Sequence, residues 1–191
     1  MEREAIAAAP SCVLVTGLQA AGKSTIGRAL AERSARGAFV EGDLFARMIV
    51  TGRAEMSRRP SPEARRQLRL RYDLATQTAV ALREAGFVVV HSDIILGDEL
   101  RAYAEAGAPG ELRIVVLVPD VETIAVRERD RPKTAYGRYG GPGEALEDVI
   151  RGHLAWIEET PPLGIRVDSS GQTVDETVDE ILDRWDEARV S

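Results

Sequence analysis

Residues 17–25 of the chain, Gly-Leu-Gln-Ala-Ala-Gly-Lys-Ser-Thr, have the spacing of a phosphate-binding loop: glycine, four residues, glycine, lysine, then serine or threonine. Residues 12–16 before it form a short apolar run with β-branched members, which is typical of a buried strand. After the loop, apolar residues recur at helical spacing. A glycine-rich turn in this context lets backbone N–H groups close around phosphate oxygens, and the helix N-terminus adds unpaired donors. The alternative is a glycine-rich turn without a ligand, and the flanking strand and helix favour a nucleotide-binding loop.

The side chains of this loop predict specific contacts. Lys23 is expected to reach the terminal phosphates, and Ser24 to ligate Mg²⁺. Lysine is scarce, since Lys23 and Lys133 stand against 23 arginines, and a compact, flexible ammonium group suits a phosphate. The residues expected to contact the nucleotide are Gly17, Ala20, Ala21, Gly22, Lys23, Ser24 and Thr25.

Composition restricts the class of protein and of partner. With 191 residues, the chain is expected to form one domain over 1–191. The net charge is −6, with arginine and acids interspersed, which argues against nucleic acid or an anionic membrane as the main partner. The single cysteine, Cys12, is expected to be a buried packing residue in a reducing compartment. Because no apolar run approaches a membrane span, we expect a soluble cytoplasmic protein, and its oligomeric state stays open.

Strands alternate with helices along the chain. The predicted strands are 12–16, 38–43, 87–91, 112–118 and 164–168. The predicted helices are 23–36, 44–51, 62–85, 96–106, 121–131, 144–159 and 174–188. Gly37 is expected to end the first helix as a C-cap, and Asp120 to cap the helix that begins at Val121. Residues 52–62 read as a loop, and 132–143 as a mobile surface segment. This alternation predicts an α/β fold with a parallel sheet covered by helices on both faces.

Two aspartates follow predicted strands. Ligands of open α/β sheets sit beyond the carboxyl ends of the strands, where Asp43 follows the second strand and Asp93 the third. The alternative for Asp43 is that it only caps the helix beginning at Leu44. The alternative for Asp93 is that it only caps a turn.

These features together resemble the small P-loop kinases, a group that includes shikimate kinase, gluconate kinase and chloramphenicol phosphotransferase. The resemblance rests on the phosphate loop, on the Gly42-Asp43 strand end, and on residues 127–131, Arg-Glu-Arg-Asp-Arg, before the flexible segment. It implies a three-layer fold with strand order 2-3-1-4-5. It also implies an arginine-bearing lid over about 127–143, and an acid after the second strand as catalytic base.

The implied strand order suggests a role for each aspartate. The third strand would adjoin the first, so Asp93 would lie near the phosphate loop, where it could hold Mg²⁺ directly or through water. The second strand is one place further out, about 5 Å. Asp43 is therefore the candidate base that takes the proton of an acceptor hydroxyl and orients it. Which of the two is the base stays open.

Arg127 and Arg131 lie four residues apart, hence on one helix face. At the base of the lid they could neutralise charge that develops on the transferred phosphoryl group. The alternative is a solvated face on which Glu128 and Asp130 supply the partners. Whether Lys133 and the lid tyrosines contact a ligand also stays open.

A pocket for the acceptor is expected beside Asp43. Phe45, Met48, Ile49 and Tyr72 would line it together with Asp93. The alternative is that the aromatic and methionine residues are core residues, since such residues at helical spacing are more often core. Of the two histidines, His91 is expected to be a hydrogen-bonded core residue and His153 a surface residue of a helix.

The first functional hypothesis is an ATP-dependent kinase that phosphorylates a hydroxyl of a small molecule with the help of Mg²⁺. The resemblance to chloramphenicol phosphotransferase suggests an antibiotic or secondary-metabolite acceptor, and the alternative is a metabolic kinase of gluconate or shikimate type. A nucleotide monophosphate kinase is less favoured, because His91-Ser92-Asp93-Ile94 replaces the Asp-Gly-Phe-Pro-Arg pattern of that group. A GTPase-like switch would need an Asn-Lys-x-Asp guanine reader, which the sequence lacks. A pure ATP-binding scaffold would show no turnover.

Overall fold

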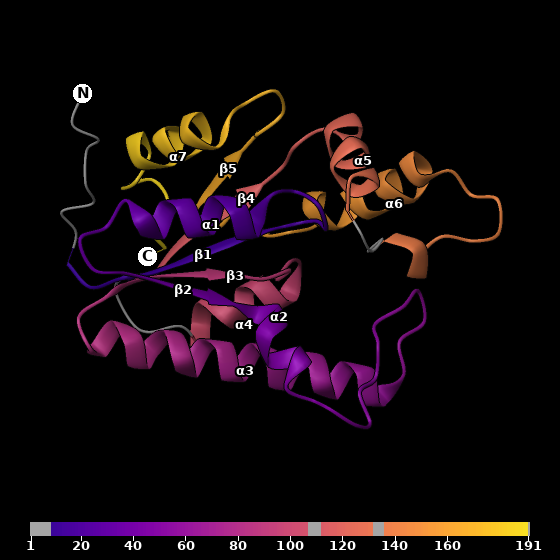
Figure 1. Cartoon of the computed structure of the whole chain (residues 1–191), viewed down its shortest axis with the longest axis horizontal. Helices are drawn as coiled ribbons and strands as arrows, with labels where there is room; N and C mark the ends of the chain where they lie inside the picture. The colour runs from indigo at the N-terminus through magenta and orange to yellow at the C-terminus, as the bar shows by residue number, and fades with distance from the viewer. Residues whose placement is uncertain (1–8, 107–111, 132–135, 191) are drawn as a thin grey trace.

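The computed structural model describes residues 9–106, 112–131 and 136–190. Its centre is a parallel five-stranded sheet in the order β2-β3-β1-β4-β5, which confirms the predicted fold class and strand order (Figure 1). The strands are β1 (Cys12–Gly17), β2 (Gly37–Glu41), β3 (Val88–Ser92), β4 (Leu112–Leu117) and β5 (Ile165–Val167).

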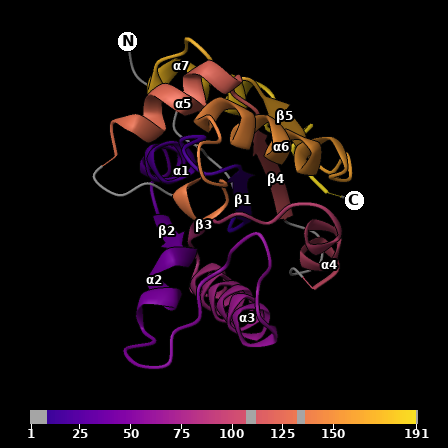
Figure 2. The same ribbon diagram turned by 90° about the vertical axis from the view of Figure 1, so that its right-hand side faces the viewer.

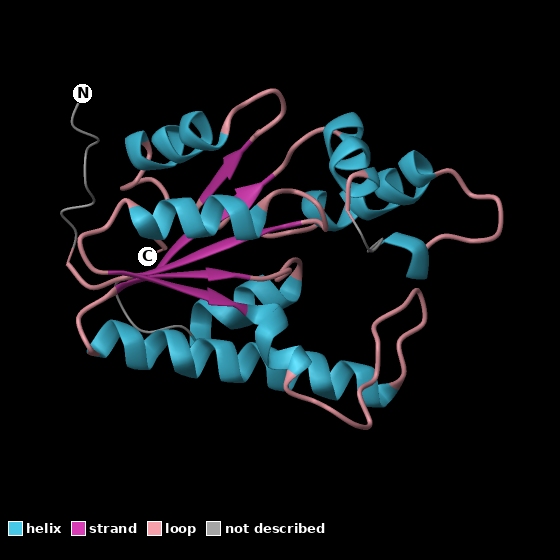
Figure 3. Cartoon of the chain, in the orientation of Figure 1, coloured by secondary structure: helices cyan, strands magenta, loops and turns pink. Residues whose placement is uncertain are grey.

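Helices cover both faces of this sheet (Figure 2). One core packs α1 (Lys23–Glu32) and α7 (Val174–Asp183) against it. A second core packs α3 (Pro62–Glu84), α4 (Asp98–Ala106) and α6 (Leu146–Glu158) against the opposite face. The shorter elements α2 (Gly42–Arg47), α5 (Val121–Arg129) and the 3₁₀ turn η1 (Tyr136–Arg138) lie beyond the carboxyl ends of the strands (Figure 3). No helix of the described residues is long and apolar enough to cross a bilayer.

The first strand is completely buried because it pairs with β3 on one side and β4 on the other. Its side chains alternate between the two faces, as the period of a strand requires. Cys12 and Leu14 enter one core, and Val13 and Val15 enter the other. The predicted burial of Cys12 is confirmed. This central position carries the end of β1, and hence the phosphate loop, to the middle of the sheet edge.

The first predicted helix is too long at its C-terminal end. It ends at Glu32, and Gly37 is the first residue of β2 rather than a C-cap. A Cβ at Gly37 would collide with the backbone of Ala31, so the glycine allows the strand to start close against the end of the helix. Gly37 is therefore required by the close approach of two backbone segments, and it does not end the helix.

The second predicted strand also extends too far. It ends at Glu41, and Asp43 lies in the first turn of α2 rather than at a strand end. A Cβ at Gly42 would collide with the carboxylate of Asp93. The glycine therefore lets the chain turn from strand to helix directly over the end of the neighbouring strand.

Residues 132–143 are predicted to be a mobile surface segment, and part of this segment is instead buried. Residues 132–135, which include Lys133, lie outside the described residues. Tyr136 is almost fully buried in the core that also holds α3 and α6. The ring of Tyr136 packs inward while its polar groups stay hydrogen-bonded. Its backbone N–H donates to the carboxylate of Glu128, and its phenolic hydroxyl donates to the carbonyl of Gln19.

Candidate active site

The phosphate loop turns sharply between β1 and α1. Gly17 has φ +145°, and a Cβ there would lie 2.6 Å from the carbonyl oxygen of Leu117, so only glycine fits. Gly22 has φ +99° and is the N-cap of α1. Ala20 also has a positive φ, of 59°, which is unusual for a residue with a side chain. Packing of the surrounding fold must therefore hold the phosphate loop in this conformation.

The N-terminus of α1 is open. It has no side-chain cap and no acid in its first turn. Three other helices are capped by side chains, namely α3 by Ser61, α5 by Asp120 as predicted, and α7 by Thr173. Unpaired N–H groups and the positive end of the helix dipole are therefore available to an anion at α1. The structure thus has the local chemistry of a phosphate site where the sequence predicts one.

Lys23, the first residue of α1, folds its ammonium group back onto the loop. Its Nζ donates to the carbonyl of Leu18 at 2.7 Å. Burial lowers the pKa of Lys23 to about 8, while the carboxylates of Asp93 and Asp43 oppose this shift. The ammonium is consequently charged at neutral pH and lies among the predicted acids of the site.

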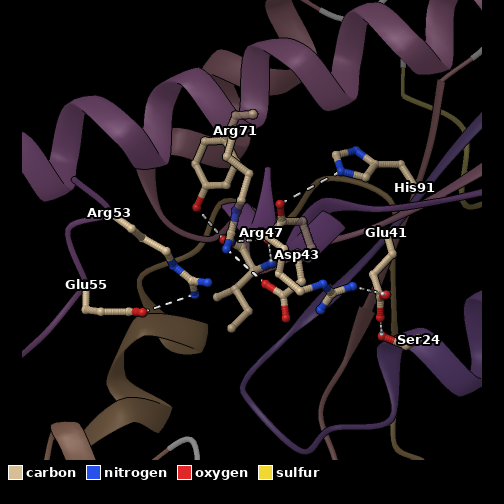
Figure 4. Close-up of polar contacts among 11 residues, drawn as sticks. Ser24, Glu41, Asp43, Arg47, Arg53, Glu55, Arg71 and His91 are labelled. Carbon is tan, nitrogen blue, oxygen red and sulfur yellow. Dashed lines mark hydrogen bonds and ion pairs between the residues drawn. The ribbon is translucent and has the colours of Figure 1, made fainter. Parts of the chain in front are cut away.

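The hydroxyl of Ser24 donates to the carboxylate of Glu41 at 2.8 Å, and Arg47 lies 3.3 Å from the same carboxylate (Figure 4). Oxygen donors of this kind suit Mg²⁺, which is usually held by one or two protein ligands together with phosphates and water. The predicted Mg²⁺ ligand Ser24 therefore has a carboxylate beside it. Sequence reasoning missed Glu41, although it precedes Asp43 by two residues at the same strand end.

Arg71, on α3, joins the two predicted aspartates. One terminal nitrogen of its guanidinium donates to Asp93, and the other donates to Asp43 at 3.1 Å (Figure 4). The Asp93 side chain is 3% exposed and that of Asp43 is 64% exposed. The strand order was expected to separate these two acids, and instead they share one cation. No sequence signal distinguishes Arg71 from its neighbours, because four other arginines lie between 65 and 83.

Asp93 is held from several directions. The N–H of Ile94 donates to the oxygen that faces Arg71, and His91 Nε2 lies 3.9 Å from the other oxygen. Burial raises the pKa of Asp93, and the charge of Arg71 opposes the shift. His91 is buried as predicted, its Nδ1 is bonded to Tyr103, and burial lowers its pKa to about 4. Asp93 is thus enclosed and faces Arg71, while Asp43 reaches solvent.

The two candidate lid arginines lie in different places. Arg127 donates to the carbonyls of Ala21 and Ser169, at 3.1 and 3.0 Å, and so ties the phosphate loop to the segment after β5. Arg131 lies 3.7 Å from the buried carboxylate of Glu128, lines the central cleft, and is close enough to lower the pKa of Lys23. Of the two, Arg131 is the one that lines the cleft together with Lys23.

A cleft of about 1180 Å³ begins at the phosphate loop and extends between α3 and α6. Ala20, Gly22, Lys23, Ser24 and Thr25 line it at one end, whereas Ala21 is buried behind it. Asp43, Arg71 and Asp93 line its middle.

Of the other residues expected beside Asp43, Ile49 and Tyr72 line the cleft. Phe45 instead packs against the core, and Met48 is exposed to solvent. From the same stretch Ala46 and Arg47 also line the cleft, and periodicity alone did not single them out.

Comparisons with known proteins agree with this architecture. A protein-family model described as AAA domain matches residues 12–159. No curated protein matches the sequence significantly. Among solved structures, an unliganded sugar kinase from a Janibacter species has a TM-score of 0.59 and 20% identity, over 93% of this chain and 95% of that one.

Two further structures are similar to the same extent. A gluconokinase from Sinorhizobium meliloti has a TM-score of 0.58 and 22% identity, over 91% of this chain and 90% of that one. A shikimate kinase from Acinetobacter baumannii, in complex with shikimate, has a TM-score of 0.60 and 16% identity, over 90% of each chain. At these identities the likeness shows a shared fold.

Proposed function

The chain belongs to the AAA domain family, and we propose that it is an ATP-dependent kinase that transfers the γ-phosphate to a hydroxyl of a small molecule. The observation that carries the proposal is one cleft that holds both the phosphate loop with Lys23 and the exposed carboxylate of Asp43. A cleft that binds a triphosphate at one end and has a hydrogen-bond acceptor in its middle can align an alcohol with the terminal phosphate.

The nucleotide end supplies binding and charge compensation. The open N-terminus of α1 and the loop N–H groups receive the phosphates, and Lys23 replaces its bond to Leu18 with one to a phosphate oxygen. Ser24, with Glu41 behind it, would hold Mg²⁺, which neutralises phosphate charge when bound. Arg131 faces the same region and would offset negative charge on the transferred group.

Asp43 is the proposed base. Its carboxylate is accessible and Arg71 restrains it from one side, which leaves acceptor positions for a substrate hydroxyl. The hydroxyl proton passes to Asp43 as the oxygen forms its bond to phosphorus, and the bond to the ADP oxygen breaks. Asp93 is the weaker candidate for this role, because it is enclosed and already engaged by Arg71 and Ile94.

The comparisons support a metabolic acceptor better than an antibiotic. The similar structures described above are a sugar kinase, a gluconokinase and a shikimate kinase. Their names describe enzymes that act on small polar molecules, and none of the three names describes an antibiotic-modifying enzyme. We therefore prefer the metabolic alternative to the resistance hypothesis.

The test is a transfer assay. Purified protein is incubated with Mg²⁺ and ATP or GTP in the presence of a panel of sugars, polyols and hydroxy acids, and mass spectrometry detects an added phosphate. We expect an ATP-dependent phosphorylated product from at least one compound, and its loss in the Lys23→Met variant. Tight GTP binding without transfer to any compound would instead favour a switch protein.

A further inference from the structure

We propose that one face of α6 binds the acceptor, and that this acceptor is an uncharged or amine-bearing ring compound with an apolar face rather than a carboxylate or a phosphate. The inference rests on the proposed kinase function, since it assigns the second substrate of that reaction. The surface is called the aromatic wall below and consists of Tyr139, Val149, Gly152, His153 and Trp156, all of which line the cleft.

The aromatic wall follows from the period of α6. Positions 149, 152, 153 and 156 recur at intervals of three and four residues, so they share one face of the helix. Tyr139 joins this face from the segment before the helix. Its ring centroid lies 4.9 Å from that of His153 in an edge-to-face arrangement, and the His153 and Trp156 centroids are 4.3 Å apart. The three rings therefore form one continuous surface.

His153 has a polar group that the protein leaves unpaired. The prediction that it is a surface residue is wrong, because the residue is 7% exposed and its ring lies among Tyr136, Tyr139 and Trp156. Its Nδ1 is bonded to the carbonyl of Val149 at 2.6 Å, while Nε2 is buried without a hydrogen-bond partner among the described residues. Leaving such a group unpaired is unfavourable, because it has lost its water without gaining a protein partner. Because the imidazole lines the cleft while Nε2 is covered, an acceptor hydroxyl or amine would supply the missing partner by displacing a side chain that covers this nitrogen.

Gly152 leaves space beside these rings. A Cβ built on it meets no atom within 4 Å, so the position faces open space and not a neighbouring helix. Trp156, one turn further along, is 43% exposed. An exposed indole next to an unfilled gap suits the flat apolar face of a ring compound, because large aromatic side chains gain most from covering apolar area.

The charges of the cleft argue against an anionic acceptor. Five arginines line the described part of the cleft, and each already has an acid within 4 Å. Arg58 pairs with Glu144 across the cleft, and Arg53 pairs with Glu55. Eight carboxylates line the described part of the cleft against these five arginines and Lys23, so a carboxylate substrate enters surroundings of net negative charge. A hydroxyl or an amine instead finds hydrogen-bond acceptors among these carboxylates.

The aromatic wall and Asp43 line the same cleft, which a loop also encloses. The Arg58–Glu144 pair, at 3.2 Å, connects the loop between α2 and α3 with the segment before α6. In Figure 1 these two segments lie at the same end of the molecule, beyond the carboxyl ends of the strands. A ring compound resting on α6 is consequently enclosed by that loop, with Asp43 in the same cleft.

The experiment measures binding without turnover. The chain has two tryptophans, and Trp185 lies over the Arg113 guanidinium, outside the lining of the cleft. In a Trp185→Phe background, fluorescence therefore reports on Trp156 alone. The probes are glucose, glucosamine, glucuronate and phenyl β-D-glucopyranoside, which share a pyranose ring but differ in charge and apolar area. Each is titrated in the presence of Mg²⁺ and a non-hydrolysable ATP analogue.

We expect glucosamine and the phenyl glucoside to change the fluorescence of Trp156 with dissociation constants at least about tenfold lower than that of glucuronate, equivalent to about 1.4 kcal/mol. Gly152→Leu, which fills the gap, should raise these constants at least tenfold, while binding of the ATP analogue stays unchanged. Tighter binding of glucuronate, an absence of any fluorescence change, or insensitivity to Gly152→Leu would overturn the proposal. Failure of phosphate transfer with the expected binding order intact would instead reject the kinase function.

Discussion

Arg71 and Asp93 form a buried ion pair at the carboxyl end of β3, and this pair positions the same guanidinium 3.1 Å from Asp43. The geometry assigns different environments to two acids that look alike in the sequence. Asp93 is enclosed and engaged inward, whereas Asp43 keeps most of its carboxylate in the cleft. The Arg71–Asp93 pair thus directs the choice of Asp43 as the proposed base.

Removing the cation of this pair should destabilise the fold. Arg71→Met leaves the carboxylate of Asp93 buried without its partner, and such a loss costs roughly 3–5 kcal/mol. Adding Asp93→Asn removes the stranded charge and should restore part of that loss. Urea unfolding measures both effects, with Arg69→Met as a control, because Arg69 is exposed and its pair with Glu99 contributes less than about 1 kcal/mol. Equal losses in the single and double variants would contradict this account.

Asp43→Asn should slow turnover by about 10²–10⁴-fold with little change in ATP affinity, because the amide cannot take the acceptor proton. Steady-state kinetics with the acceptor identified in the transfer assay gives the turnover number, and calorimetry gives the ATP affinity. Asp73→Asn is the control, since Asp73 is exposed on α3 and is not among the described lining of the cleft. Near-normal turnover in Asp43→Asn would remove Asp43 from the role of base.

ATP affinity should fall as the pH rises above about 8. Burial lowers the pKa of Lys23 to about 8 in the free protein, and a bound triphosphate favours the charged ammonium. Below this pKa the lysine is already charged, so affinity stays level. Above it each further pH unit should weaken binding about tenfold, until the pKa of the bound state is reached. Calorimetric titrations between pH 6.5 and about 9.5 test this. The Lys23→Met variant should bind weakly with no such slope, and a wild-type profile that is flat would refute the assignment.

Arg127→Ala should act on nucleotide binding rather than on transfer. Its guanidinium bonds to the carbonyls of Ala21 and Ser169, so its loss frees the phosphate loop from the segment after β5. Charge-assisted bonds of this kind contribute about 1.5–3 kcal/mol, so the KM for ATP should rise roughly 10- to 100-fold. The rate at saturating ATP should change far less. A large fall in that rate with unchanged KM would instead indicate contact with the transferred group.

Arg131→Ala should lower the rate at saturating ATP and change the KM for ATP far less. Arg131 lines the cleft beside Lys23, and removing one stabilising group from a transition state costs about 10²–10³ in turnover. The rate at saturating ATP is the decisive quantity. Arg129→Ala is the control, since Arg129 pairs with Glu147 on the helix surface and is not among the described lining of the cleft. An unchanged saturated rate in Arg131→Ala would put this arginine outside the reaction centre.

The sequence by itself determined the phosphate loop, the α/β alternation and the burial of Cys12 and His91. These features are local: glycine spacing, apolar period and strand length each lie within a few neighbouring residues. The strand order was available only through the family resemblance, and the structure confirms it. The boundaries at Gly37 and Gly42 were wrong because their glycines serve contacts with Ala31 and Asp93, which lie on other elements.

Only the tertiary structure decided how the charged groups are paired. Arg71 comes from the middle of an arginine-rich helix and meets Asp43 and Asp93 because α3 packs across the ends of β2 and β3. Glu41 beside Ser24 and the burial of His153 have the same origin. An ion pair or an aromatic contact depends on distances between elements far apart in the chain. Local patterns do not encode those distances, because packing sets them.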